Sequence, residues 1–166
     1  MQKDLFGNNE KEKVYISIEL AKEIVGLEIY PNFITAKEEK ELINSIDNSP
    51  WLNDLKRRVQ HYGYKYDYRA RKIDNSLYLG ALPSWSEIII QKMLDDKIIN
   101  FTPDQAIVNE YKIGLFLEPR TLLVMKKESR YDWYHGIPQR KSDKFNGEII
   151  KRTKRVSITY RKVIIE

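Results

Sequence analysis

The 166-residue sequence contains no cysteine and only two histidines, and this narrows the chemistry open to it. Without cysteine, the chain has no disulfide, no thiolate zinc site and no cysteine nucleophile. A bound metal ion would need nitrogen and oxygen ligands. His61 and His135 are the only imidazoles in the sequence. Thiol chemistry is therefore excluded.

The sequence also lacks a long apolar run. No stretch of about 18 consecutive apolar residues is present, which argues against a membrane-spanning helix. Residues 1–13 are polar and contain no apolar segment of the kind found in signal peptides. We therefore expect a soluble, monomeric intracellular protein, located in the cytoplasm or the nucleus.

Hydrophobic residues make up 42% of the chain, which is enough for one buried core and one globular domain at this length. The 29 lysines and arginines outnumber the 24 aspartates and glutamates, so the formal net charge is +5. This charge is compatible with a polyanionic partner, although many basic surfaces are only solvated. Several of the eleven tyrosines alternate with basic residues, which is a more specific signal.

Two segments carry the start signal of a helix. Thr35 followed by Glu38 is a capping-box pattern, and it predicts a helix ending near residues 48–50. Ser84 followed by Glu87 repeats this pattern and predicts a second helix. The buried side of the second helix is expected to consist of Ile88, Ile89, Met93 and Leu94.

β-Branched and aromatic residues mark the expected strands. Residues 27–30 form a short run that ends at Pro31, and longer runs occupy residues 106–111, 121–125 and 155–163. Two helices followed by several strands predict an α+β domain whose amino-terminal helices pack on the sheet. We expect the strands to form a jelly-roll or double-stranded β-helix.

Polar side chains recur at strand spacing in the second half of the chain. Asn109 and Tyr111 share one face of a predicted strand, and Arg155 and Arg161 share one face of another. Buried arginines are rare without an anionic partner, so this set indicates an anion site, with His135 as a candidate metal ligand beside it. The alternatives are polar residues on a half-exposed strand and a structural histidine.

A basic and aromatic segment precedes these strands. Cations contact phosphates and aromatic faces stack on unpaired bases, so the segment is a candidate for nucleic-acid binding. The alternative is a solvated edge hairpin whose tyrosines pack on the sheet. The candidate residues are Arg57, Arg58, His61, Tyr62, Tyr64 and Tyr66.

Four motifs follow one another in an order that resembles a known family. They are R-R-V-Q-H-Y-G-Y at residues 57–64, N-x-Y at 109–111, W-x-H-G-I at 133–137 and R-x-S-x-T-x-R at 155–161. Together they resemble the AlkB family of Fe(II)- and 2-oxoglutarate-dependent dioxygenases, particularly relatives that act on the wobble uridine side chain of tRNA. The resemblance implies a double-stranded β-helix, Fe(II) and 2-oxoglutarate as cofactors, and alkylated DNA, alkylated RNA or tRNA as partner.

The resemblance also implies roles for individual residues. His135 matches the distal metal-binding histidine of the family. Tyr111 and Arg155 would hold the distal carboxylate of 2-oxoglutarate. Asn109 and Arg161 would lie toward its keto-acid end.

The family pattern divides the chain and is interrupted once. Residues 1–26 would be an amino-terminal arm and residues 27–166 the dioxygenase domain, in which residues 51–69 match the nucleotide-recognition lid. The pattern breaks at residues 114–115, where the family has its H-x-D metal motif and several further strands. With two of three metal ligands absent from the sequence, we expect no stable Fe(II) site.

Three interpretations of this interruption are open. The chain is a nucleic-acid dioxygenase with an internal deletion that impairs it, or a non-catalytic module that binds nucleic acid or a partner. Alternatively, the loss of core strands leaves edges unpaired and the product folds poorly.

Overall fold

The computed structural model describes residues 3–4, 23–53, 57–67, 73–111, 117–134, 142–145, 148–151 and 154–165. The chain divides into two compact units. The first consists of Met1–Glu39 and Lys112–Lys154, and the second of Lys40–Tyr111 and Arg155–Glu166.

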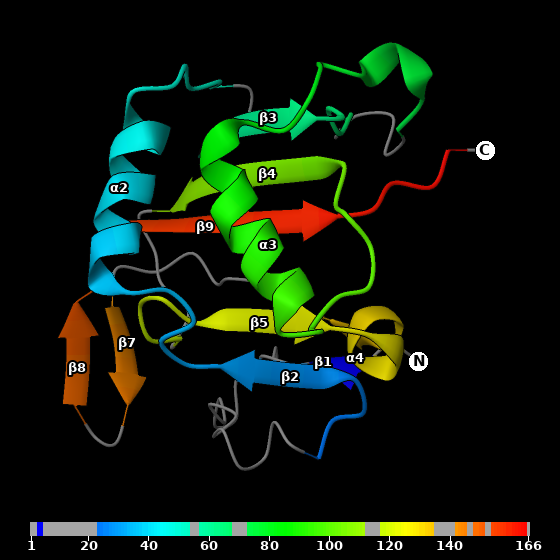
Figure 1. The fold of residues 1–166 in the computed structure, drawn as a ribbon. Coiled ribbons are helices and arrows are strands. Elements are labelled where there is room, and N and C mark those ends of the chain that lie inside the picture. Colours follow the sequence, from blue (N-terminus) through cyan, green and yellow to red (C-terminus); the bar gives the residue numbers. More distant parts are fainter. Residues whose placement is uncertain are drawn as a thin grey trace. The chain divides into compact units, whose positions relative to one another are not determined.

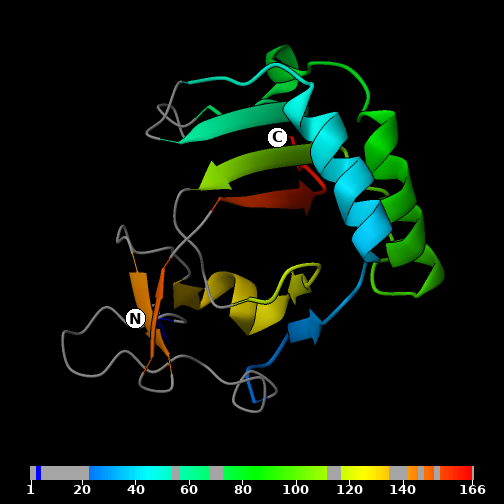
Figure 2. The ribbon, with the colours of Figure 1, turned by 90° about the vertical axis from the view of Figure 1, so that its left-hand side faces the viewer.

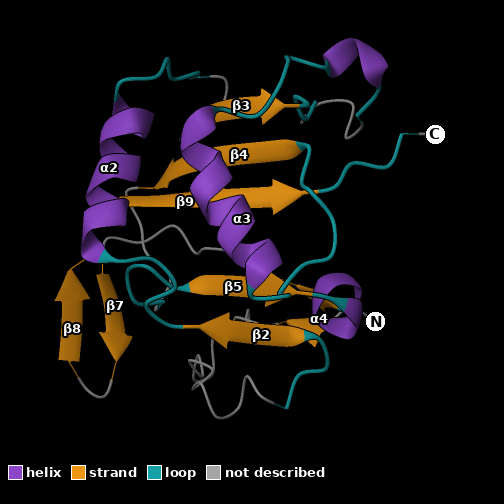
Figure 3. Ribbon diagram, viewed as in Figure 1, coloured by secondary structure: helices purple, strands orange, loops and turns teal. Residues whose placement is uncertain are grey.

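Helices are interspersed among the strands of the described chain (Figures 1 and 3). In chain order they are β1 (Lys3–Asp4), β2 (Leu27–Tyr30), α2 (Ala36–Asp47), β3 (Arg58–Gly63), the 3-10 turns η1 (Asn75–Leu77) and η2 (Ser84–Ser86), α3 (Glu87–Asp95), β4 (Gln105–Tyr111), β5 (Leu122–Met125), α4 (Lys127–Tyr131), β6 (Trp133–Tyr134), β7 (Ser142–Phe145), β8 (Glu148–Lys151) and β9 (Arg155–Arg161).

The second unit is built on a three-stranded antiparallel sheet in the order β3-β4-β9. Its strand β4 is central because it pairs with β3 on one side and with β9 on the other. Helix α3 and the part of α2 that belongs to this unit cover one face of the sheet (Figure 2). Side chains buried in this unit include Ile46, Val59, Ile90, Met93, Ala106 and Val108.

The first predicted helix and its capping box are confirmed. The Thr35 amide donates to Glu38 Oε2 at 2.6 Å, and the Glu38 amide donates to Thr35 Oγ1 at 3.2 Å. These two bonds satisfy amide groups that a helix start leaves without intrahelical partners. Helix α2 then runs from Ala36 to Asp47, close to the expected end.

The second predicted capping box is wrong, although its helix exists. Residues Ser84–Ser86 form a 3-10 turn, so Ser86 and not Ser84 precedes the helix. The Ser86 hydroxyl donates to the Pro83 carbonyl at 2.7 Å and caps no helix amide. Ile90 and Met93 are buried, whereas Ile88 is 59% exposed, because it points to a different side of the helix.

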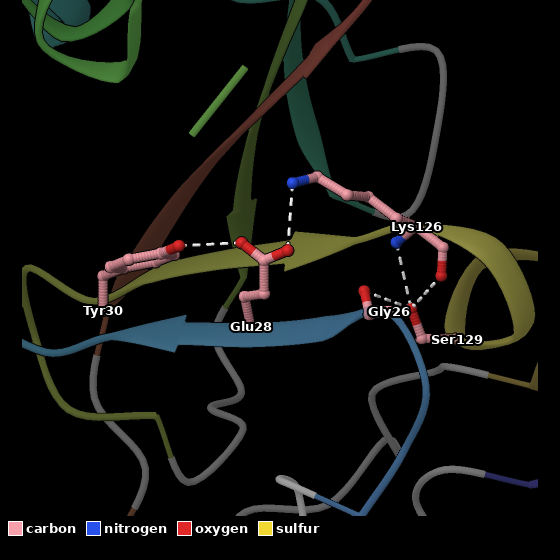
Figure 4. A network of polar contacts seen from close by, with 5 residues as sticks. All are labelled: Gly26, Glu28, Tyr30, Lys126 and Ser129. Carbon is pink, nitrogen blue, oxygen red and sulfur yellow. Dashed lines mark hydrogen bonds and ion pairs between the residues drawn. The ribbon is translucent and has the colours of Figure 1, made fainter. Parts of the chain in front are cut away.

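The first unit contains the antiparallel pair β2-β5, the parallel pair β1-β6 and the antiparallel pair β7-β8. A polar network ties β2 to the segment after β5 (Figure 4). Glu28 accepts from the Tyr30 hydroxyl at 2.7 Å and pairs with Lys126 Nζ at 2.9 Å, and both contacts lower its pKa. The Ser129 hydroxyl donates to the Gly26 carbonyl at 2.9 Å.

The expected strands are confirmed as β2, β4, β5 and β9, so the chain is a mixed α/β protein whose described sheets are antiparallel apart from the pair β1-β6. Most of the expected amino-terminal arm lies outside the described residues. Within the part of the chain that the structure describes, no helix is long and apolar enough to cross a bilayer.

Candidate functional site

Strand β4 places Asn109 and Tyr111 at one end of the three-stranded sheet. Asn109 lies opposite Val59 of β3 and Ser157 of β9, and Tyr111 lies opposite Arg155. Directly opposed residues of an antiparallel pair share a face of the sheet. Asn109 and Arg155 therefore lie on one face. The Tyr111 side chain is outside what the structure describes.

Arg161 lies on the same face but at the opposite end of β9, across from Gln105. A strand rises about 3.4 Å per residue, so the Cα atoms of Arg155 and Arg161 are about 20 Å apart along the strand. Both arginines are half-buried. The register thus brings Arg155 next to Asn109, whereas Arg161 would share a small ligand with them only by extending its side chain along the sheet.

Arg57 contacts Asn109 at this end of the sheet. Its Nε donates to Asn109 Oδ1 at 2.8 Å, although the two residues are 52 positions apart in the sequence. Arg57 is half-buried, and Asn109 is 5% exposed. The sequence placed Arg57 among the nucleic-acid contacts, and the structure places its guanidinium beside the candidate anion site. The sequence signal that could have indicated this position is the two-residue spacing between Arg57 and Val59 of β3, because residues two apart in a strand lie on the same face.

Arg58 lies on the opposite face, where it pairs with Glu110. Its Nε donates to Glu110 Oε1 at 3.0 Å, and its Nη2 pairs with the other carboxylate oxygen. The guanidinium also lies over the Trp51 ring, 4.6 Å from the centroid. The hydrogen bonds with Glu110 raise the pKa of the exposed Arg58. Neither arginine of the R-R pair is thus a simple solvated cation.

His61 and Tyr62 are part of the sheet packing. His61 is 8% exposed and lies opposite Ile107, on the same face as Asn109. Tyr62 points to the other face, where its ring meets Trp85 edge-on with centroids 5.4 Å apart. The Tyr62 hydroxyl donates to Gln60 Oε1 at 3.1 Å. The geometry of these two residues matches the alternative interpretation, in which the aromatic residues of this segment pack on the sheet.

Tyr64 is paired with Tyr78, which the sequence did not single out. The two residues form an isolated antiparallel bridge, and their ring centroids are 5.0 Å apart at an interplanar angle of 50°. Tyr78 and Leu79 are 54% and 56% exposed, while Tyr64 and Tyr66 are half-buried. Tyr64, Tyr78 and Leu79 form a partly exposed surface of two aromatic rings and one aliphatic side chain beyond the end of β3, called here the aromatic surface.

The described residues do not assemble an iron site. His135 lies outside the described residues, and His61 is in the sheet. Among the residues that the structure describes, no group of three or more histidine, aspartate or glutamate side chains could hold a metal ion. No H-x-D occurs anywhere in the sequence, since neither histidine is followed by aspartate two positions later.

Comparison with known proteins identifies relatives, although no family model matches the chain. The uncharacterized protein L905 of Acanthamoeba polyphaga mimivirus is 33% identical over 191 positions, which cover 88% of this chain and 89% of that protein. The alkylated DNA repair protein ALKBH8 homolog of Arabidopsis thaliana is 30% identical, covering 84% of this chain and 59% of that protein. Mouse tRNA (carboxymethyluridine(34)-5-O)-methyltransferase ALKBH8 is 31% identical, covering 83% and 30%.

Several of these relatives are named as AlkB homologues. The chain therefore belongs to the AlkB-like family of Fe(II)- and 2-oxoglutarate-dependent dioxygenases. It spans more than half of the Arabidopsis protein and under a third of the mouse protein. The alignment with the mimivirus protein runs over 191 positions, more than the 166 residues of this chain.

Proposed function

We propose that this chain is an AlkB-type nucleic-acid-binding domain that retains a dicarboxylate site without a complete iron site. The observation that carries the proposal is the placement of Asn109 and Arg155 on one face at one end of the sheet β3-β4-β9. An arginine and an amide presented on one half-buried face suit the carboxylate of a small organic anion such as 2-oxoglutarate.

The proposed fold is a double-stranded β-helix that lacks an internal block. The aligned 88% of this chain is about 146 of its 166 residues, so about 45 of the 191 aligned positions have no counterpart here. A block of that size would hold the H-x-D motif together with neighbouring strands. The break in the family pattern at residues 114–115 is the position that we propose for it.

The proposed partner is single-stranded nucleic acid. The names of the relatives refer to alkylated DNA repair in Arabidopsis and to a tRNA uridine in mouse. The chain has a formal charge of +5 and a partly exposed aromatic surface at Tyr64, Tyr78 and Leu79. Stacking on such surfaces is a common mode of single-strand binding. Oxidation of the bound base is not part of the proposal, because the iron ligands are incomplete.

Thermal unfolding in EDTA tests the dicarboxylate site. A ligand at 100 times its dissociation constant stabilises the folded state by about 2.7 kcal/mol, so 2-oxoglutarate should raise the Tm by several degrees. Arg155→Ala should abolish this shift. Lys162→Ala is the control, because Lys162 pairs with Asp104 at 2.8 Å and is not one of the proposed ligands. A shift that persists in Arg155→Ala would contradict the proposed site.

A further inference from the structure

We propose that the outer edge of strand β9 is a docking surface for an extended, acidic segment of a partner protein. This segment would pair with β9 and add a strand to the sheet β3-β4-β9. The inference goes beyond the proposed function, because it uses neither the dicarboxylate site nor the aromatic surface. It rests on the backbone groups of β9 that point away from β4.

The hydrogen-bond pattern of the sheet determines which groups these are. On β3, the amide and carbonyl of Val59 bond to Leu52, so they face away from β4. Because this direction alternates along a strand, the even-numbered residues of β3 bond to their even-numbered partners in β4. The odd-numbered residues of β4 then bond to their odd-numbered partners in β9. The amides and carbonyls of Val156, Ile158 and Tyr160 therefore point to the outer edge of β9.

These outward groups have no partner in the part of the chain that the structure describes. Strand β9 pairs there with β4 alone (Figure 1), and no further backbone hydrogen bond reaches Val156, Ile158 or Tyr160. All seven residues of β9 are half-buried, whereas residues 105–109 of the central strand are buried. Strand β9 is thus an edge strand of this sheet.

The opposite edge of the sheet, on β3, is covered. Leu52 exchanges two backbone hydrogen bonds with Val59, at 2.8 and 3.0 Å, and the Leu79 amide donates to the Gly63 carbonyl at 2.7 Å. Residues 156–160 of β9, by contrast, contain no proline and no charged side chain, and their register with β4 is continuous. A regular edge of this kind is a template for a further strand.

The side chains of β9 define the chemistry of the partner. Val156, Ile158 and Tyr160 lie on one face, and the hydroxyl residues Ser157 and Thr159 lie on the other. Basic residues flank them at both ends, and residues 151–162 contain no acidic side chain. Charge complementarity favours an antiparallel segment that alternates apolar and hydroxyl side chains and carries acidic residues at its ends.

A second copy of this chain fits the edge less well. If two β9 strands paired antiparallel with Ile158 opposite Ile158, Arg155 of one copy would lie opposite Arg161 of the other. Like charges directly opposite one another destabilise a strand pair. The charge of β9 therefore favours a different, acidic chain over self-association.

Fluorescence anisotropy with the labelled peptide Glu-Val-Thr-Ile-Thr-Val-Glu tests the inference on the full chain. When the peptide lies antiparallel to β9, its isoleucine exchanges both backbone hydrogen bonds with Ile158. Methylation of the isoleucine amide nitrogen should weaken binding about tenfold or more. Methylation of the next threonine nitrogen, which faces away from β9, is the matched control and should leave binding nearly unchanged. A peptide with lysine at both ends should bind more weakly, and added salt should reduce this difference.

Ile158→Pro tests the edge from the side of the protein. Proline removes the outward amide donor, and an edge strand tolerates it where the N–H faces away from the sheet. This variant should lose peptide binding, whereas Ile158→Val should retain it. Thermal unfolding of both variants checks that they fold. If Ile158→Pro does not fold, the two methylated peptides decide the question on the wild-type protein.

Three results would overturn the inference. Equal binding of the two methylated peptides, or no binding of the glutamate peptide, would show that β9 does not accept a strand. Equal binding of the glutamate and lysine peptides would remove the acidic partner. Wild-type dimers in sedimentation velocity that Ile158→Pro abolishes would assign the edge to a second copy of this chain instead.

Discussion

At the residue scale, Gly63 is a motif residue that the backbone conformation requires. It ends β3 with a φ of +71°, and a Cβ atom added there would lie 1.8 Å from the Asp104 carbonyl oxygen. Both features exclude any other residue without a rearrangement. The glycine of the H-Y-G-Y motif is therefore required for β3 to pass close to the residue before β4.

We predict that Gly63→Ala lowers the unfolding free energy by more than the roughly 1–3 kcal/mol expected from a strained φ alone. The added methyl group also collides with the backbone. Gly80→Ala is the control, since Gly80 has a φ of +112° but nothing within 4 Å of its added Cβ. Urea denaturation would measure both variants. Equal losses of unfolding free energy would show that the collision at Gly63 is relieved at little cost.

A second feature at the residue scale is Tyr160, whose hydroxyl makes a pH-dependent contribution to the unfolding free energy. Burial raises the pKa of its hydroxyl above the usual value of about 10. A group whose pKa is higher in the folded state stabilises it fully below the unfolded pKa and loses that contribution as pH rises. We therefore predict that the unfolding free energy falls as pH increases above about 10. Tyr160→Phe should show a shallower fall in denaturation experiments across this range, and an identical fall would contradict the assignment.

At the element scale, Gln60 fastens strand β3 to the end of helix α2. Its amide donates to the Ile46 carbonyl at 2.8 Å and to the Ser49 carbonyl at 3.1 Å. The Ile46 carbonyl also accepts from the Ser49 amide at 3.1 Å, so the Gln60 amide is a second donor to it from a neighbouring element. Tyr62 completes the arrangement by donating to Gln60 Oε1.

We predict that Gln60→Leu costs about 1–3 kcal/mol of unfolding free energy, because it removes one of two donors to the Ile46 carbonyl and the amide donor to the Ser49 carbonyl. Tyr62→Phe removes one donor to Gln60 and should cost less, about 0.5–1.5 kcal/mol. Equilibrium denaturation of both variants would establish the order. A larger loss for Tyr62→Phe would mean that the hydroxyl, not the amide, holds these elements together.

The aromatic surface beyond β3 makes a separate prediction about nucleic acid. Tyr64→Ala and Tyr78→Ala should each weaken binding of single-stranded RNA by about 1–3 kcal/mol, the usual contribution of one stacked base. Tyr62→Phe is the control, since Tyr62 packs against Trp85. Fluorescence anisotropy at several salt concentrations would measure the losses. Unchanged isotherms in both alanine variants would leave these tyrosines as packing residues.

Local patterns predicted several elements, while the contacts that define the site depend on strand pairing. Thr35 and Glu38 are three residues apart, so their capping box was visible in the sequence. Asn109 and Tyr111 share a face by strand periodicity alone. Arg57 meets Asn109 across 52 positions, and that contact follows from the register between β3 and β4, which no local pattern encodes.

At the scale of the whole molecule, the iron site expected from the family does not agree with the iron ligands available in the sequence. The family depends on Fe(II), but the chain has two histidines and no H-x-D motif. The sheet β3-β4-β9 nevertheless keeps Asn109 and Arg155 on one face. The proposed anion site would not need iron, because its residues lie on one continuous sheet of the second unit.

The central claim is that this chain binds a dicarboxylate independently of iron. The most direct measurement is titration of 2-oxoglutarate into the wild-type protein under anaerobic conditions, once in EDTA and once after incubation with Fe(II) and removal of free metal. We predict the same affinity in both titrations and no stoichiometric iron in the desalted protein. Retention of one iron per chain, with 2-oxoglutarate binding only in its presence, would contradict the claim.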